Sequence, residues 1–162
     1  EKRFLFNFLL YNFKISKESR IKKKYDIIFY IRKHQSKRNE FLVNIINKLS
    51  YKYKICILGE KVQPNKNIYN MGYVNRKEAQ KLIKFSKSAV STYENLFSYF
   101  LLDCLKYKLS IFYNSNFKLN NNISSNFLFP INFNNLNKSL KIIKNNFNKK
   151  NKKKIFYKKK KF

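Results

Sequence analysis

Continuous apolar runs alternate along this chain with segments whose apolar positions recur at helical spacing. The runs are rich in β-branched and aromatic residues, as in strands that are buried on both faces. The predicted strands are 25–31, 53–58, 68–74, 88–91, 109–113 and the strand-like 127–133. The predicted helices are 40–49, 75–85, about ten residues after Glu94-Asn95, and 139–147. Because strands and helices alternate, we expect an α/β fold with a doubly wound parallel sheet in a single domain.

The segment from Ser86 to Asn114 holds the most informative part of this pattern. It contains a strand, a polar turn, a helix and a second strand, which together describe one βαβ crossover. In such units the turn after the first strand faces the ligand crevice at the carboxyl edge of the sheet. Glu94 in the turn and Asp103 in the helix are two of only eight acidic residues. We therefore expect any chemical site to lie here.

Composition divides the chain into three parts. Residues 1–24 read as a linker or the end of a missing N-terminal domain, because a basic, poorly periodic stretch precedes the first strand. Residues 25–147 form the expected domain. Nine of the fifteen residues in 148–162 are Lys, and we expect a disordered tail there. The chain starts at Glu1, which suggests a fragment. Its longest apolar run, at 4–11, is too short to span a bilayer, and no signal peptide is evident.

The net charge of +29 first suggests nucleic-acid binding. However, the enriched residues are Lys, Asn, Ile, Phe and Tyr, which A/T-rich codons encode, and only five Arg are present. A dedicated phosphate reader would use more Arg, whose planar fork matches phosphate geometry. We therefore favour a nucleotide-biased, AT-rich genome as the origin of the charge, and keep a basic nucleic-acid- or ribosome-associated protein as the alternative.

The sequence lacks the residues or motifs that several kinds of chemistry require. The chain has one histidine, His34, so a Ser/His/Asp or Cys/His arrangement and a His metal site are not expected. Neither a G-x-x-x-x-G-K-[ST] loop nor a G-x-G-x-x-G loop is present, which argues against an ATPase or a simple dehydrogenase. Cys56 and Cys104 lie in an apolar strand and an apolar helix, and we expect buried, reduced thiols in a cytosolic protein.

Arg32 and Lys37 are the first candidate site residues. Both follow the carboxyl end of the first strand and enter the first turn of a helix. Two cations and free backbone N–H groups at a helix N-terminus suit a diphosphate. A solvated basic loop is an equally good interpretation of the spacing.

The turn at 91–94 allows two interpretations. Ser91-x-x-Glu94 matches a capping box, with Ser91 as the N-cap of the next helix. Alternatively, Glu94 accepts hydrogen bonds from sugar hydroxyls, while free N–H groups of Leu96, Phe97 and Ser98 face a phosphate. Asp103 lies about two and a half turns further along, and could equally be a solvent-facing helix residue.

In this order the segments resemble the C-terminal donor-binding domain of GT-B glycosyltransferases, a Rossmann-like half of the GT-B fold, and in particular the retaining enzymes. The resemblance covers about residues 25 to 114. Arg and Lys five apart after a strand correspond to Arg32 and Lys37, and a strand ending in Gly corresponds to Gly59. The N-x-x-x-x-G-Y/F-V segment corresponds to 67–74, and the E-x7-E type motif corresponds loosely to Glu94 and Asp103.

The resemblance implies a role for each matching residue. Arg32 and Lys37 would hold the donor diphosphate; Glu94 would be catalytic, meeting the donor sugar with the backbone of Asn95, Leu96 and Phe97. Asp103 would bind the ribose, Tyr73 and its neighbours would line the base pocket, and Gly59 would belong to the donor-binding site. The sequence departs from the pattern in three places. The second acid is Asp and comes one position late, the glycine-rich turn is replaced by 95–98, and Lys108 stands at a usual glycine.

The function implied is transfer of a sugar from a nucleotide diphosphate sugar to a surface polysaccharide or glycolipid acceptor. No cofactor or metal is implied beyond the donor substrate. The acceptor would be bound through the missing N-terminal domain, so this chain alone would bind donor without turnover. A cytoplasmic location follows, with a possible peripheral contact with acidic lipid on the inner membrane face.

Overall fold

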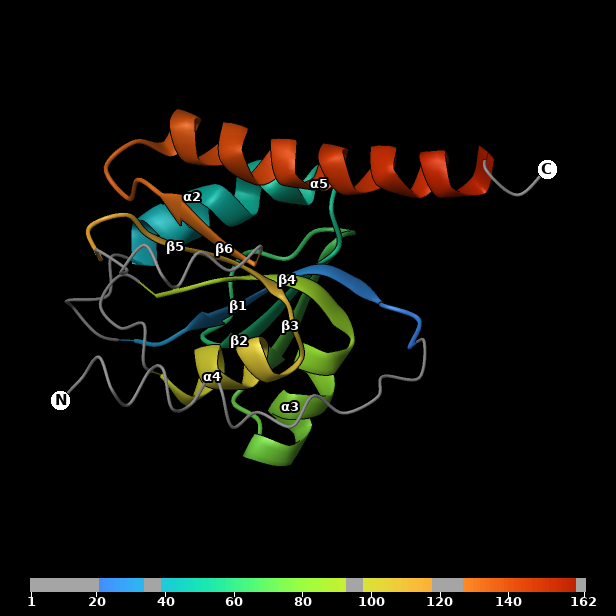
Figure 1. The fold of residues 1–162 in the computed structure, drawn as a ribbon. Helices are drawn as coiled ribbons and strands as arrows, with labels where there is room; N and C mark the ends of the chain where they lie inside the picture. Colours follow the sequence, from blue (N-terminus) through green and yellow to red (C-terminus); the bar gives the residue numbers. More distant parts are fainter. Residues whose placement is uncertain (1–20, 34–38, 93–97, 118–126, 160–162) are drawn as a thin grey trace, which may run out of the picture.

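The computed structural model of the chain describes residues 21–33, 39–92, 98–117 and 127–159, with side chains described as far as Phe147. Over these ranges the strands are β1 (Tyr25–Ile31), β2 (Ile55–Gly59), β3 (Ile68–Gly72), β4 (Ser86–Val90), β5 (Ser110–Asn114) and β6 (Leu128–Ile131). The helices are α2 (Asn39–Ser50), α3 (Arg76–Lys84), α4 (Tyr99–Lys106) and α5 (Leu136–Lys159). Figure 1 shows these elements along the chain.

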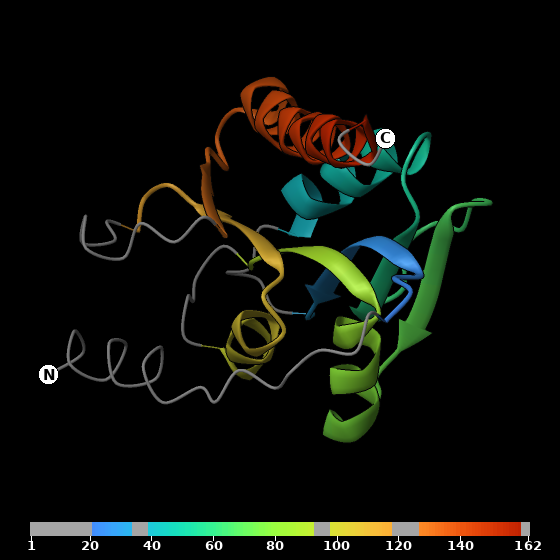
Figure 2. The same ribbon diagram turned by 45° about the vertical axis from the view of Figure 1, so that its right-hand side comes forward.

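All six strands belong to one parallel sheet with the order β3-β2-β1-β4-β5-β6. The strands β3 and β6 lie at its two edges, as Figure 2 shows. The chain builds outward from β1 to β3, and then returns to the other side of β1 to add β4. This reversal between β1 and β4 is the switch point of a doubly wound sheet, where ligands bind beyond the carboxyl ends of the strands. The predicted class, a Rossmann-like α/β domain, is confirmed.

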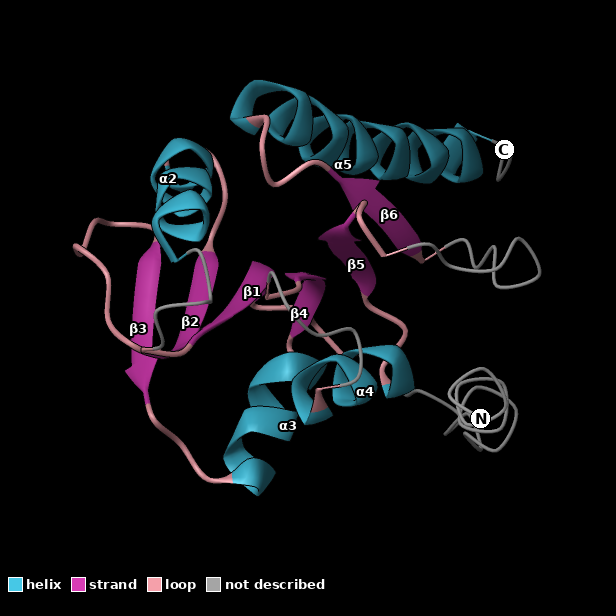
Figure 3. Ribbon diagram, turned by 90° about the vertical axis from the view of Figure 1, so that its left-hand side faces the viewer, coloured by secondary structure: helices cyan, strands magenta, loops and turns pink. Residues whose placement is uncertain are grey.

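Helices cover both faces of the sheet. Figure 3 shows α2 and α5 on one face and α3 and α4 on the other. Strand β1 contributes to both cores: Ile27 and Phe29 pack with residues of α2 and α5, whereas Ile28 packs with residues of α3 and α4. This double burial explains why β1 is apolar without alternation.

Two helix starts have clear local causes. The side chain of Asn75 accepts a hydrogen bond from the backbone N–H of Glu78 at 3.0 Å, so Asn75 is the N-cap of α3. Before α5, the Asn135 side chain accepts from the backbone N–H of Lys138 at 2.9 Å. The hydroxyl of Ser139 donates to the carbonyl of Asn132 at 2.7 Å, which fixes the chain entering that helix.

The last helix is longer than the sequence predicts. We expected a helix ending at Phe147 and a disordered tail, but the helical backbone of α5 continues to Lys159 and extends past the sheet in Figure 1. Neither Gly nor Pro occurs after Pro130, and Lys is a good helix former. Nothing in the local sequence therefore ends the helix at 147.

Candidate functional site

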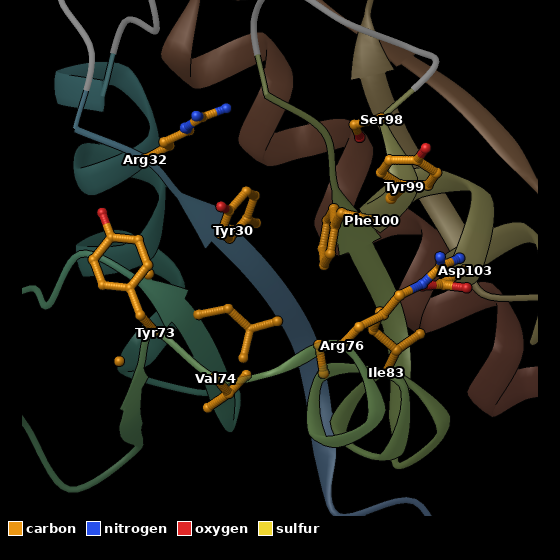
Figure 4. A pocket seen from close by; sticks show the side chains of 14 residues that line it. Tyr30, Arg32, Tyr73, Val74, Arg76, Ile83, Ser98, Tyr99, Phe100 and Asp103 are labelled. Carbon is orange, nitrogen blue, oxygen red and sulfur yellow. The ribbon is translucent and has the colours of Figure 1, made fainter.

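A cavity of about 520 Å³ lies at the carboxyl edge of the sheet. Its lining comes from the ends of β1, β2 and β3 and from helices α3 and α4, as Figure 4 shows. It therefore occupies the β3-β2-β1 side of the switch point, the region where a doubly wound sheet binds its ligand.

The floor of this pocket is apolar. The rings of Tyr30 on β1 and Phe100 on α4 lie 5.9 Å apart between centroids, at an angle of 37°. Leu58 and Ile83 complete this surface, and both belong to the core cluster on the α3 and α4 face. The floor can therefore accept the face of a ring or of a sugar, while specific polar recognition must come from the rim.

Gly59 brings the end of β2 against β1. Its φ of +85° lies in the left-handed region, and a Cβ there would be 2.0 Å from the carbonyl oxygen of Ile31. The same oxygen accepts a hydrogen bond from the backbone N–H of Glu60 at 2.8 Å. Only glycine permits this close approach, which places Glu60 next to the end of β1.

Tyr73 and Glu60 form a polar pair on one side of the pocket. The Tyr73 hydroxyl donates a hydrogen bond to Oε1 of Glu60 at 2.6 Å. This bond is the main reason that the pKa of Tyr73 lies above its ordinary value of 10.0, and contact with the backbone of Lys33 opposes part of the rise. Tyr73 is 65% exposed, so its ring borders the pocket mouth.

A second polar group lies on the other side, around Asp103 of α4. Its Oδ1 accepts a hydrogen bond from the amide of Gln80 on α3 at 2.9 Å, and its Oδ2 lies 3.7 Å from Nε of Arg76. The Arg76 guanidinium also lies over the ring of Tyr99, 4.9 Å from its centroid. Figure 4 shows Arg76 and Asp103 together, across the pocket from Arg32 and Tyr73.

Four predicted site residues line this one pocket: Arg32, Gly59, Tyr73 and Asp103. The alternative of a solvent-facing Asp103 is wrong, because the residue is buried against α3. The other predicted site residues lie outside the described ranges, namely Lys37, Glu94, Asn95, Leu96 and Phe97. Their roles stay predictions, whereas the parallel pairing of β1 with β4 that they require is present.

The capping interpretation of Ser91 is wrong for the described helix. The side chain of Ser98 caps α4 instead, accepting from the backbone N–H of Leu101 at 3.3 Å. Ser91 is fully buried at the end of β4, where its N–H donates to the carbonyl of Phe112 at 2.8 Å. This bond continues the β4–β5 ladder by one residue, and helix α4 begins eight residues later, at Tyr99.

Sequence reasoning missed several lining residues, among them Arg76, Tyr99, Tyr30 and Phe100. Arg76 directly follows the N-cap of α3, and a cation at the start of a predicted helix is the signal that could have identified it. Tyr30 and Phe100 look like ordinary core residues in an apolar strand and helix. Only the sheet order brings them to the same edge.

The two cysteines are buried, free thiols, as predicted. Burial raises the pKa of Cys56 from 9.0 to about 12 and the pKa of Cys104 well above 9.0, with the charge of Asp103 adding to the latter. Neither thiol is therefore a nucleophile at neutral pH. Among the described residues, no group of three His, Cys, Asp or Glu side chains could hold a metal ion.

The fold and the pocket define a class: a Rossmann-like α/β domain with a cavity at the carboxyl edge of its parallel sheet. A scan against protein-family models finds no match, and a search of curated proteins finds no match either. None of the helices in the described part of the chain is long and apolar enough to cross a membrane. The nature of the ligand must accordingly be argued from the chemistry of the pocket.

Proposed function

We propose that this chain is the donor-binding half of a glycosyltransferase, which moves a sugar from a nucleotide diphosphate sugar to a surface polysaccharide or glycolipid acceptor. The observation that carries the proposal is the convergence of Arg32, Gly59, Tyr73 and Asp103 on one pocket. These residues come from four separate segments, and each was predicted as a site residue from the sequence alone. Ligands of doubly wound sheets bind at the carboxyl edge, so residues that converge there can contact one ligand.

The pocket suits a nucleotide in its distribution of polarity. Its apolar floor offers contact area for a base or sugar ring, and its lining includes cations, a phenol and the carboxylate of Asp103. Arg32 directly follows β1, beside the switch point, and this position supports a role for its guanidinium in binding the diphosphate. Glu94 would meet the donor sugar as the catalytic residue, with the backbone of 95–97 and Lys37 completing the phosphate site.

The chemical role of the cations follows from charge development. As the bond between sugar and diphosphate breaks, negative charge grows on the leaving phosphate oxygens. Positive charge from Arg32 and Lys37 would stabilise that charge more in the transition state than in the ground state. The acceptor would be held by a domain outside this chain, so this chain alone would bind the donor without turnover. It would act in the cytoplasm, where its basic surface favours acidic lipid head groups.

Calorimetric titration with UDP and with GDP tests this function. We expect Arg32→Ala to weaken binding of the preferred nucleotide about tenfold or more, because a charge-assisted hydrogen bond is lost. Lys141→Ala is the matched control, since it removes one positive charge from the exposed surface of α5. Equal weakening by both variants would indicate a general charge effect and contradict the proposal, as would absence of binding to either nucleotide.

The alternative, a basic nucleic-acid- or ribosome-associated protein, is favoured by one observation. Residues 148–159 continue α5 as a helical backbone, and this segment is rich in Lys without any acid. Phosphate contacts from such a segment would make RNA affinity fall steeply with salt. A chain ending at 147 should then lose most of its RNA affinity and its salt slope. Unchanged RNA affinity would remove this function.

A further inference from the structure

A second cavity, of about 550 Å³, lies at the amino edge of the sheet, where the chain enters its strands. Its lining comes from the starts of β1 and β3 and from the residues just before β1, β2 and β4, and these four strands are neighbours in the sheet. The candidate site lies at the carboxyl edge, so the two cavities occupy opposite edges. Among the described residues that line the second cavity, all are lysines or aromatic residues and none is an acid.

The aromatic residues give this cavity ring surfaces that are held in place by the sheet. Tyr25 on β1 and Tyr69 on β3 are in edge-to-face contact, with ring centroids 5.4 Å apart at an angle of 63°. The carbonyl of Phe85, directly before β4, accepts hydrogen bonds from the N–H groups of Lys24 and Tyr25, and the Lys24 ammonium lies 5.0 Å from the Phe85 ring centroid. Tyr69 is 37% exposed, so a planar ligand in the cavity can reach it and stack.

Exposed lysines give the same cavity a positive charge. Lys22, Lys24 and Lys54 come from the segments before β1 and β2, and all three are exposed. Asp26 is close to them in the sequence, but it pairs with Lys87, and its Oδ2 accepts a hydrogen bond from the backbone N–H of Lys54 at 2.9 Å. Within the described ranges, no carboxylate forms an ion pair with the ammonium groups of the three exposed lysines. The cavity therefore combines aromatic rings with positive charge that no ion pair compensates.

The Lys-rich end of α5 begins at the same edge of the sheet. Phe147 of α5 stacks on Tyr53 with 4.7 Å between ring centroids, and Tyr53 directly precedes Lys54. Beyond Phe147 the helical backbone continues to Lys159. Figure 1 shows the start of β1 and the far end of α5 on the same side of the molecule. A polyanion bound at the cavity would therefore lie close to the start of this Lys-rich segment.

The shape and lining of the cavity favour one kind of anion. Codon bias accounts for many exposed lysines, but it does not account for a cavity that is lined by rings. An acidic membrane would meet the lysines at the rim and leave the rings without a partner. Duplex nucleic acid keeps its bases stacked inside, whereas a single strand offers free bases together with phosphates. Lysine, a flexible point charge, suits phosphate contacts that do not read a sequence.

We propose that this cavity binds single-stranded nucleic acid, with one base stacked against Tyr69 and the neighbouring phosphates in contact with Lys22, Lys24 and Lys54. Binding tolerates any sequence, because every base has a π-face. The proposal does not rest on the proposed function, since the donor nucleotide would bind at the opposite edge of the sheet. It also differs from phosphate contacts by α5 alone, because such contacts give no preference for a strand that carries bases.

The test compares a strand that carries bases with one that does not. The probes are labelled oligo(dT) of about twelve nucleotides, within the known range of single-strand site sizes, and an abasic backbone of the same length and charge. Fluorescence anisotropy follows the binding of each to the full chain. We expect the wild type to bind oligo(dT) about fivefold or more tightly than the abasic strand, because the abasic strand cannot stack.

Substitutions of Tyr69 place this preference in the cavity. Tyr69→Leu keeps an apolar contact with Tyr25 but removes the ring, and should reduce the preference to about twofold or less. Tyr69→Phe keeps the ring and should keep the preference. Tyr51→Leu is the matched control, since Tyr51 is 84% exposed and does not line the cavity.

The salt dependence of binding tests the lysines. Lys54→Gln should reduce the slope of log affinity against log salt concentration by about 0.7, the value for one phosphate contact on a single strand. Lys141→Gln removes a charge from the exposed surface of α5 and should leave the slope unchanged. Since Lys54 is exposed, this variant keeps the inference testable if Tyr69→Leu does not fold, which circular dichroism and thermal melting determine.

Four results would overturn the inference. Equal binding of the two strands by the wild type would mean that phosphate contacts alone hold the nucleic acid. A preference for bases that survives in Tyr69→Leu, or that Tyr51→Leu removes equally, would mean that no base occupies the cavity. An unchanged salt slope in Lys54→Gln would remove the lysine contacts. Binding to vesicles of acidic phospholipid but to neither strand would assign this surface to a membrane.

Discussion

The Cα of Gly59 faces the carbonyl oxygen of Ile31 so closely that an added Cβ would lie 2.0 Å from it. This contact joins the ends of β2 and β1, which are paired in register as Ile31 and Gly59. It also leads directly into Glu60, whose N–H binds the same oxygen at 2.8 Å. The geometry of this side of the pocket therefore depends on the absence of a side chain at Gly59.

We predict that Gly59→Ala destabilises the domain by about 3 kcal/mol or more. A left-handed φ costs an L-residue about 1–2 kcal/mol, and the clash with a backbone atom adds to it because neither partner can move freely. Urea unfolding followed by circular dichroism measures the change.

Gly72→Ala is the matched control for this substitution. Gly72 has a φ of +72°, but nothing lies within 4 Å of the position of its Cβ. Its substitution should cost only the conformational penalty of about 1–2 kcal/mol. Equal losses in the two variants would show that the close approach to Ile31 contributes nothing.

The contacts of Asp103 on α4 with Gln80 and Arg76 on α3 give a second prediction. Asp103→Ala should destabilise the domain by about 1.5–3 kcal/mol, because the Gln80 amide loses a charged partner. The contact with Arg76 contributes less, since the Arg76 side chain is 64% exposed and its charge is screened. Asp103→Asn retains an oxygen that can accept from Gln80 and should cost less than Asp103→Ala.

A double-mutant cycle identifies the source of this energy. Gln80→Ala combined with Asp103→Ala should show a coupling of about 0.5–3 kcal/mol, because the two side chains are in contact. If the two effects simply add, the hydrogen bond between α3 and α4 does not stabilise the domain, and the prediction is wrong.

Strand β1 and the sheet class could be predicted from the sequence because burial on both faces leaves a local record. The bounds of β1, Tyr25–Ile31, agree with the prediction, since its continuous apolar run reflects packing on two layers of helices. Strand β6 was also visible despite Pro130. It is an edge strand that pairs only with β5, so the missing N–H of a proline can be tolerated.

The start of α4 and the partners of Asp103 could not be predicted, because both depend on tertiary contacts. Ser91-x-x-Glu94 has the pattern of a helix start, but the N–H of Ser91 donates to the carbonyl of Phe112 in β5, and the described helix begins only at Tyr99. Gln80 and Asp103 are 23 residues apart and meet only because α3 and α4 pack on the same face of the sheet. No local pattern records such a meeting, whereas four of the residues that line the pocket could be predicted as site residues.

The buried thiol of Cys56 leads to a prediction about the stability of the domain at alkaline pH. The pKa of Cys56 is about 12 in the folded chain, against 9.0 ordinarily, because burial disfavours the thiolate. The folded state therefore keeps a proton that the unfolded state releases above pH 9. Stability from this group is complete below pH 9 and falls as the pH rises toward 12, by up to about 1.4 kcal/mol per pH unit.

Urea unfolding between pH 8 and 10.5 tests this dependence. In Cys56→Ala the free energy of unfolding should be lower at pH 8 but should fall less steeply, with a difference from wild type that closes by about 2 kcal/mol at pH 10.5. Ile57→Val is the control, since it alters the same buried strand without removing a titratable group, and its curve should run parallel to the wild type. A parallel curve for Cys56→Ala would contradict the prediction.

Lys108 occupies the turn between α4 and β5 with a φ of +52°, in the left-handed region. Its N–H donates to the carbonyl of Leu105 and the N–H of Leu109 donates to that of Cys104, which together form a Schellman motif. This motif favours glycine at the position of Lys108, and the GT-B pattern places a glycine there. Lys108 therefore adopts the same left-handed backbone conformation that a glycine would adopt here, and its side chain makes that conformation strained.

We predict that Lys108→Gly stabilises the domain by about 1 kcal/mol, since the left-handed penalty for a side chain disappears and exceeds the added entropy of the unfolded chain. Lys106→Gly provides the opposite case at a matched loss of charge. Lys106 is exposed and lies in the last turn of α4, so glycine there should destabilise by up to about 1 kcal/mol. Thermal unfolding of the two variants at neutral pH should therefore move the midpoint in opposite directions. If both variants lower it, Lys108 is not strained, and the turn does not need the glycine that the resemblance places there.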